Sequence, residues 1–577
     1  MTSTQPSSSP GPRPEPASVT GVQLMQGIGV REARGFWADA WSSVLKQPRA
    51  VLSLTWIGLV AFFAVFAPVL ASGHPVWFTE KLADGSQRAW SPLASSLSSA
   101  DILLLVATLV AAVVFVLPIK KWMGWTVGRR LGLLLASVGQ GAVMVVVATA
   151  LKGYLEQREV PPWAAAWRAR PGLPWEAAAV VGALSVMIFA WLPTFRTLAA
   201  RLSFAVLVAV IAGAAIGASW RTPPEVFSYR QKVDAGQAQA VWTLVPWSPV
   251  QRGTNLRLLE PGSDPSTPDR DAWIRAEFRP LVAAAREKAG PEAEKAAEAA
   301  KVDAPSPRAA EQLAREARER VLAEAESAVR AQALPELEKR ALEKFPKGTA
   351  PEFVMGTDGI GQDVLSQMMY ACRLSISIGL VSTGLAVVIG VTIGAIMGYF
   401  GGWIDTLLFR IVEIFMAIPV LFLLIVAAAV LPRNTYVMMM IIGCVTWTGA
   451  ARFTRAEFMR LRNQDFVQAA QAVGLPLRSV LFKHMLPNGV TPVLVDASFA
   501  IAAAIQIEAV LSYLALGPAE QASWGRLLAS ATNEVGEFKW WMAIFPGFAI
   551  FLTALSYNIL GEALRDAIDP KLKKARV

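Results

Sequence analysis

Three carboxylates within mainly hydrophobic segments have the clearest potential for chemistry in this 577-residue sequence: Glu413, Asp496 and Glu508. An ionised side chain is costly inside a membrane, so carboxylates there serve to move protons or solutes, or to hydrogen-bond between helices. All three are candidates for a translocation path. We expect Glu508 to form interhelical hydrogen bonds and Asp496 to line the path, and packing between helices is the alternative for each.

Motifs for catalysis are missing from the sequence. There is no G-x-x-x-x-G-K-[ST] phosphate-binding loop, and the two histidines, His74 and His484, are too far apart for an obvious zinc site. Cys372 and Cys444 lie in or beside apolar segments, where a cysteine is usually a small buried hydrophobe and not half of a disulfide. We therefore expect no enzymatic activity, no metal site and no cofactor bound by this chain.

The elements that must position these residues are membrane helices. Hydrophobic residues make up 54% of the chain and charged residues only 17%, and 20 tryptophans and a net charge of +10 suit a protein of the bilayer and its interfaces. The sequence therefore predicts an all-α polytopic membrane protein with about ten helices, because a span needs roughly 20 mainly apolar residues. The predicted spans are 51–71, 101–118, 131–151, 175–194, 202–219, 374–398, 406–431, 436–450, 489–515 and 541–563.

Composition divides the chain into five regions. These are a cytoplasmic tail with an interfacial helix at 1–50, a first span at 51–71, a four-helix membrane region at 72–219, an extracytoplasmic insert at 220–351, and a region at 352–577 with five spans and a cytoplasmic loop at 451–488.

Clusters of lysine and arginine orient the spans, because they collect on the cytoplasmic side. When the chain is followed from a cytoplasmic N-terminus, most clusters fall on inside loops, including 451–488 and the C-terminal tail. The outside segment 152–174 is an exception, since it carries four basic residues. We expect both termini in the cytoplasm, with no cleavable signal peptide at the N-terminus.

The insert contains an Ala/Glu/Arg-rich helical arm at 271–345. A stripe of small residues follows helical spacing there: Ala314, Ala317, Val321, Ala325 and Ala328. Pro305 and Pro307 should divide the arm in two, and Pro335 should begin a third part. A solvated arm is one interpretation, and docking to a partner protein is the other.

The loop at 465–487 has the most informative pattern. It predicts two short helices, Asp465 to Val473 and Leu477 to His484, separated at Gly474, whose missing Cβ permits a left-handed turn. The small side chains of Ala469 and Ala470 leave one face of the helix without bulky groups, so that another protein can approach closely. A purely structural or DNA-binding-like hairpin is the alternative.

Six residues of this loop keep a long, specific spacing: Gln468, Ala469, Ala470, Gly474, Leu486 and Pro487. The spacing resembles the EAA loop of ABC importer permeases. In that family the loop fits a groove on the ATP-binding subunit and transmits closure of the ATPase dimer to the membrane helices, which is the role the resemblance implies here. Gln468 stands where the family expects Glu, and His484 where many members have an aliphatic residue.

The segment before residue 374 carries a second set of informative residues: Gly356, Thr357, Asp358, Gly361, Asp363 and Arg373. With Met416–Pro419, Ser512–Gly517, Ser523–Gly525 and 545–570, they resemble the C-type permease subunit of the dipeptide/oligopeptide/nickel family over residues 352–574. Gln362 and Gln367 depart from the pattern, because family members commonly have Arg there.

The resemblance implies a permease subunit of a binding-protein-dependent, ATP-driven importer of peptides or related small solutes. Its partners would be two ATP-binding subunits that hydrolyse the ATP, a second related permease and an extracytoplasmic solute-binding protein, in a bacterial-type inner membrane. Four spans and the soluble stretch are then an insertion between the family's first and second spans. Because four is even, the family's orientation is preserved.

Two other functions remain open from the sequence. One is an ion-coupled secondary carrier, suggested by the carboxylates within spans. The other is a permease-derived membrane scaffold or sensor that uses the added helices and the arm. No residue identifies the substrate.

Overall fold

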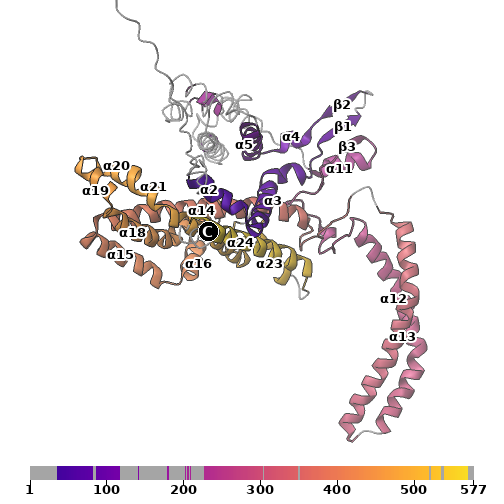
Figure 1. The fold of residues 1–577 in the computed structure, drawn as a ribbon. Coiled ribbons are helices and arrows are strands. Elements are labelled where there is room, and N and C mark those ends of the chain that lie inside the picture. The colour runs from indigo at the N-terminus through magenta and orange to yellow at the C-terminus, as the bar shows by residue number, and fades with distance from the viewer. Residues whose placement is uncertain are drawn as a thin grey trace, which may run out of the picture.

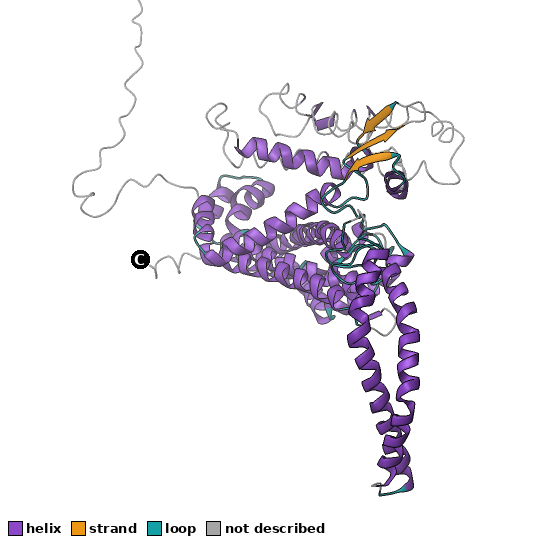
Figure 2. Ribbon diagram, turned by 90° about the vertical axis from the view of Figure 1, so that its right-hand side faces the viewer, coloured by secondary structure: helices purple, strands orange, loops and turns teal. Residues whose placement is uncertain are grey.

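The computed structural model describes residues 36–568 apart from 82–85, most of 117–225, 303–304, 348–350, 519–520 and 534–537. The described part is a bundle of long helices that carries a small sheet and a protruding pair of helices (Figures 1 and 2). The predicted all-α membrane fold is confirmed. The predicted spans 131–151, 175–194 and 202–219 and the loop 152–174 lie largely outside the described residues.

Four helices are long and apolar enough to cross a membrane: α3 (Pro48–Leu70), α14 (Val364–Phe400), α22 (Thr491–Tyr513) and α24 (Trp540–Ile568). Apolar segments form helices in a bilayer because every backbone polar group must be satisfied within the segment. A shorter apolar stretch lies within α5 (Ser99–Val116). Before α3, the helix α2 (Phe36–Leu45) packs its Ala40 and Val44 against the end of α24.

Two further spans are bent pairs, which raises the number of spans in the described part of the chain to as many as six. Helices α15 (Gly402–Ala417) and α16 (Val420–Val430) meet at 82°, at Pro419, which lacks an N–H and disfavours helix at the residue before it. Helices α17 (Thr435–Thr446) and α18 (Thr448–Arg462) meet at 43°. The segment after Ala450, which the sequence suggested as the start of a loop, therefore continues as helix to Arg462.

A three-stranded sheet lies at one end of the bundle. Strand β1 (Trp77–Lys81) is central and pairs antiparallel with β2 (Gln87–Trp90) and with β3 (Ala238–Val241). Helices α4 (Pro92–Ser96) and α11 (Val226–Asp234) lie next to these strands in the sequence. Because β2 and β3 pair with the same strand, Trp90 and Ala238 lie at the same end of the bundle.

The helical arm consists of α12 (Thr267–Val302) and α13 (Pro307–Lys344), which pack on each other as an antiparallel pair and extend away from the bundle (Figures 1 and 2). Ala293 and Ala314 are buried in the arm, and small side chains there let the helices approach closely. The expectation of a break at Pro335 is wrong, since α13 passes through it. Ala328 is exposed and so does not belong to the buried stripe.

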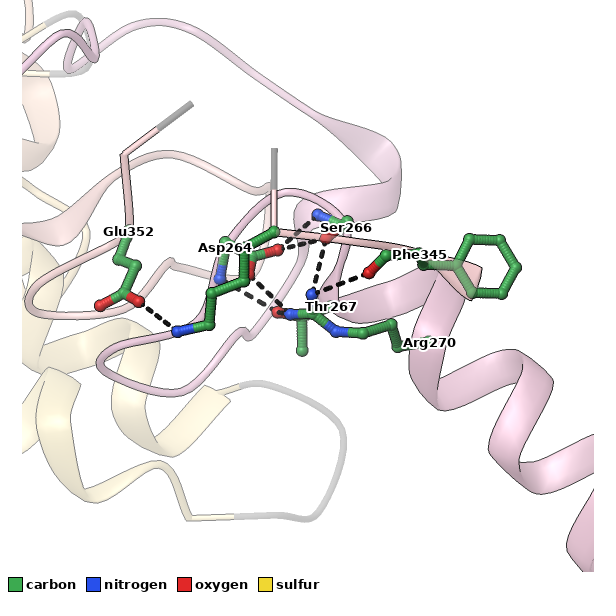
Figure 3. A network of polar contacts seen from close by, with 7 residues as sticks. Asp264, Ser266, Thr267, Arg270, Phe345 and Glu352 are labelled. Carbon is green, nitrogen blue, oxygen red and sulfur yellow. Dashed lines mark hydrogen bonds and ion pairs between the residues drawn. The ribbon is translucent and has the colours of Figure 1, made fainter. Parts of the chain in front are cut away.

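A polar network closes the base of the arm (Figure 3). Arg270 at the start of α12 donates from Nη2 to Oδ2 of Asp264 at 2.6 Å and from Nη1 to the carbonyl oxygen of Phe345, which follows α13, at 3.3 Å. Both partners of the ion pair are largely buried, with Asp264 only 2% exposed. The network therefore joins the first and last residues of the arm.

Candidate functional sites at the two ends of the bundle

The spans have two distinct ends. We call the end that carries β1–β3 the sheet end, and the opposite one, which carries residues 465–487, the loop end (Figure 1). Helix α14 joins them, because it begins beside the sheet-end loops at Asp363 and finishes beside Arg462 of α18.

The loop consists of α19 (Asp465–Ala472), a turn at Gly474, and a helical stretch made of α20 (Leu477–Ser479), the π-helical turn η2 (Val480–Met485) and α21 (Leu486–Gly489). Gly474 has φ +75°, a conformation that a side chain disfavours. The predicted pair of helices with a break at Gly474 is present. The π-helical turn was not foreseen, and such turns are frequent at functional sites.

A small apolar core attaches this loop to α18. It contains Phe458, Leu461, Val467, Ala470, Val480 and Met485. Residues of α18, α19 and η2 thus share one core, which holds the loop against the end of α18.

The structure separates the two alanines of the loop. Ala469 is exposed, whereas Ala470 is 7% exposed and faces the apolar core. Only Ala469 is therefore accessible to another protein. Gln468 and Pro487 are also exposed, and Leu486 is half-buried against the core.

Exposed apolar side chains on the loop were missed by the sequence reasoning. They are Phe466, Val473, Leu475, Leu477 and Phe482, and Val473 is 79% exposed. Apolar residues scattered through a loop otherwise rich in charge are the signal that could have identified them. These five exposed side chains, which we call the apolar loop surface, are of a kind suited to contact with another protein.

Glycines bring α18 into backbone contact with α14. A Cβ on Gly390 would lie 2.6 Å from the carbonyl oxygen of Trp447, and one on Gly394 would lie 2.4 Å from that of Ala451. Gly398 repeats the spacing against Arg455. Small residues at every fourth position are typical of closely packed membrane helices. Arg462 adds a hydrogen bond of 3.0 Å to the carbonyl oxygen of Tyr399.

The glycines of the 356–363 motif shape the sheet end. Gly356 and Gly361 have φ of +76° and +79°. A Cβ on Gly361 would lie 2.0 Å from the carbonyl oxygen of Gly253, and one on Gly356 would lie 2.6 Å from that of Leu259. Only glycine therefore allows the segment from 253 to 261 to pack against the motif.

The polar residues of the motif hold this loop in place. Asp358 accepts hydrogen bonds from the backbone N–H groups of Ile360 and Gln362 and from Gln367 Nε2 at 2.8 Å. Asp363 accepts from the N–H of Ser366 at 2.7 Å and so caps α14. Burial raises the pKa of the Asp363 carboxyl, although the hydrogen bonds from Ser366 oppose the shift.

Thr357 and Arg373 connect the motif to distant parts of the chain. The carbonyl oxygen of Thr357 accepts from Trp541 Nε1 of α24 at 3.2 Å. Arg373 on α14 donates from Nε to the carbonyl oxygen of Ala64 at 2.9 Å and forms an ion pair with Asp101 of α5. The family-like core and the first helix of the inserted region are thus joined by a charge pair.

A cavity of about 720 Å³ opens at the sheet end. Its walls come from residues 248–252, from the motif and first turns of α14, and from residues 521–530 around α23 (Trp524–Asn533). Asp358 and Arg373 of the motif line it. Within the described ranges, no group of three His, Cys, Asp or Glu side chains is placed to hold a metal ion.

The three carboxylates within spans occupy different environments. Glu508 is fully buried and accepts from Ser512 Oγ at 2.6 Å and Ser523 Oγ at 2.8 Å, so it ties α22 to the start of α23. Glu413 pairs with Arg410 on the same exposed face of α15. Asp496 is half-buried, and its Oδ2 lies 3.3 Å from where a Cβ on Gly449 would stand.

The carboxylates of α22 are too far apart to act as a pair. Asp496 and Glu508 are twelve residues apart, which corresponds to about 18 Å along a helix. Neither lines the sheet-end cavity. The path-lining role expected for Asp496 stays a prediction.

Known proteins resemble this chain in two separate segments. Residues 390–574 match the family of binding-protein-dependent transport system inner membrane components, and residues 35–83 match the N-terminal transmembrane domain of oligopeptide transport permease C.

This chain matches most of the length of several individual relatives. A dipeptide transport system permease protein, DppC, of Alkalihalophilus pseudofirmus is 36% identical over 227 residues, which are 39% of this chain and 74% of the relative. An oligopeptide transport system permease protein, OppC, of Haemophilus influenzae is 38% identical over 37% of this chain and 70% of its own. OppC of Bacillus subtilis is 37% identical over 38% and 72%. The chain therefore belongs to the binding-protein-dependent ABC permeases, as a C-type subunit of the oligopeptide and dipeptide group.

Proposed function

We propose that this permease imports peptides or related small solutes and that separate ATPase subunits drive it through the loop at 465–487. The observation that carries the proposal is the apolar surface of that loop, which stands on a core shared with α18. Relatives with peptide-transport names support the substrate class. The chain itself would bind no cofactor, and ATP would be hydrolysed by its partners.

The proposal fixes an orientation in the inner membrane. The loop end is cytoplasmic together with both termini, and the sheet end is extracytoplasmic. Basic residues around the loop support this orientation, since they favour the cytoplasmic side: Arg452, Arg455, Arg460, Arg462, Arg478 and Lys483. The partners are two ATP-binding subunits at the loop, a second related permease beside the spans, and a solute-binding protein at the sheet end.

A contiguous chain of packed elements would carry the movement. When the ATPase subunits close, the loop moves with α18 because they share a core. Helix α18 is in backbone contact with α14 through Gly390, Gly394 and Gly398. The other end of α14 lines the sheet-end cavity at Gln367, Tyr370 and Arg373. Movement of the loop would thus reach the cavity through two rigid helices.

Copurification and uptake test the coupling role. Tagged chain should bring down its ATPase subunits. Ala469→Glu should abolish both this association and ATP-driven uptake, because it places a charge beside Phe466 and Val473, which are three and four positions away on the same helical face. Ala323→Glu on the exposed face of α13 is the matched control and should change neither. If the Ala469→Glu variant takes up solute at the wild-type rate, the loop is not the site at which the ATPase subunits act.

Energy dependence separates this function from an ion-coupled carrier. Uptake by the reconstituted complex should require ATP and persist after the proton gradient is collapsed. The opposite pattern would identify a secondary carrier. Loss of a partner protein without loss of uptake, after removal of residues 272–345, would instead assign a docking role to the arm.

A further inference from the structure

A second, much smaller cavity lies next to one wall of the sheet-end cavity. Its volume is about 20 Å³, whereas a single water molecule needs about 10–15 Å³. Its walls come from residues 247–256, from Phe353 and from the 356–363 motif. Ser248 and Arg252 line both cavities. The small cavity therefore has room for one water-sized ligand, directly behind the larger one.

Three buried polar atoms belong to residues that line this small cavity. They are Trp247 Nε1, Gln251 Oε1 and Asp363 Oδ1, and none has a hydrogen-bond partner among the described residues. Trp247 is 5% exposed and Asp363 is 2% exposed. Folded proteins rarely leave buried polar atoms unpaired, because the lost hydration is costly. Three such atoms on the residues of one cavity point to a shared ligand.

The indole ring of Trp247 is held in one orientation. It stacks on Phe353, with 4.4 Å between the ring centroids, and the guanidinium carbon of Arg230 lies 3.8 Å from the centroid of its ring. These contacts fix the direction of the indole N–H, which can only donate. The ligand must therefore accept a hydrogen bond from Trp247.

The other two atoms are acceptors. Asp363 uses its Oδ2 to accept from the N–H and the Oγ of Ser366, at 2.7 and 2.6 Å. The N–H of Leu365 also opposes the rise in the pKa of this carboxyl, but a carboxylate oxygen can accept two hydrogen bonds, so Oδ1 still has room for a donor. Gln251 adds an amide oxygen. The ligand must therefore donate as well as accept.

We propose that the small cavity binds one ordered water molecule, which accepts a hydrogen bond from Trp247 and donates to Asp363 and Gln251. Neither a metal ion nor ammonium can accept a hydrogen bond, whereas water can, and buried waters typically make about three hydrogen bonds. The water joins residues 247–256 to the start of α14. It thereby holds one wall of the sheet-end cavity in place, whatever solute the permease carries.

A cryo-EM map of the assembled complex, at a resolution that shows ordered waters, tests the site directly. One peak should lie in the small cavity, about 2.7–3.2 Å from the three polar atoms. An empty cavity in such a map would overturn the proposal. A peak with contacts of about 2.0–2.6 Å to Asp363 and Gln251 would also overturn it, because those are the distances of bound metal ions.

Removing the indole N–H tests the same site by hydrogen exchange. Trp247→Phe keeps an aromatic ring against Phe353 but has no donor, so it should abolish the peak. It should also raise the exchange of residues 248–256 about fivefold, the value of one hydrogen bond. Trp242→Phe is the matched control, because Trp242 also contacts Arg230 but does not line the small cavity. Equal exchange in the two variants would overturn the proposal.

A double substitution separates a shared water from general loosening of the segment. Gln251→Met keeps the length of the side chain without its amide and should by itself raise exchange to a similar extent. In the Trp247→Phe background it should add little, because one water serves both side chains. If the two effects multiply, the side chains act independently and the proposal is wrong.

Discussion

Arg455 of α18 and Asp405 of α15 form a two-point ion pair, with Nε 2.5 Å from Oδ1 and Nη2 2.7 Å from Oδ2. The guanidinium also lies over the ring of Phe409, 4.4 Å from its centroid. Asp405 is 8% exposed, so solvent screens the pair weakly. The contact joins the first helix of one bent span to the second helix of the other, close to the loop.

Removing this pair should destabilise the loop end. Asp405→Asn leaves the charge of Arg455 without its partner, and we expect a loss of about 2 kcal/mol in the free energy of unfolding, less than for a fully buried pair. Thermal unfolding of the detergent-solubilised complex measures it. Arg410→Gln breaks the exposed pair with Glu413 and serves as control. Equal effects of both changes would contradict a special role for Asp405.

The two alanines of the loop should respond differently to the same substitution. Ala470→Glu buries a carboxylate in the core of the loop and should increase hydrogen exchange of residues 465–487. Ala469→Glu should leave exchange unchanged, because that side chain is exposed, although association with the ATPase subunits and ATP-driven uptake are lost. Raised exchange in both variants would mean that the loop surface is not a separate binding face.

The close contact between α14 and α18 should be sensitive to a single methyl group. Gly394→Ala places a Cβ 2.4 Å from the carbonyl oxygen of Ala451, so the helices must separate. Overpacking of this kind costs about 1–3 kcal/mol and should uncouple ATP hydrolysis from uptake. Gly384→Ala on the same helix has open space around its Cβ and is the control. Unchanged coupling in Gly394→Ala would exclude this contact from the transmission path.

Acidification should loosen the base of the arm. Burial alone would raise the pKa of Asp264, but hydrogen bonds from Ser266 and Arg270 and the charge of Arg270 outweigh it, so the pKa lies below its ordinary value of 3.8. A depressed folded pKa means that the stabilisation is complete above 3.8 and is lost as pH falls through the folded pKa. Limited proteolysis at the ends of α12 and α13 should therefore accelerate below that pH.

A variant without the carboxylate tests the cause. The protease should cleave the Asp264→Asn variant rapidly at neutral pH, and acidification should increase its cleavage rate little further. If wild type and variant share the same acid response, other groups hold the base of the arm.

Local chemistry along the chain was sufficient for several features of this protein. Apolar segments of span length must be helical in a bilayer, so α3, α14, α22 and α24 followed from composition. The turn at Gly474 followed from the missing Cβ. The motif at 356–363 was recognised by its resemblance to a permease family, and the structure adds that its two glycines have positive φ. These features depend on residues close together in the sequence.

Contacts between distant segments were decided only by the tertiary structure. The periodicity of a helix does not specify its neighbour, so the sequence placed Ala469 and Ala470 on one face, whereas the packing of α18 buries one of them. Arg373 meets Asp101 across 272 positions, and three arginines from separate segments meet at one cavity. Charge and burial at such places depend on which segments come together, and that information lies in the packing of the whole chain.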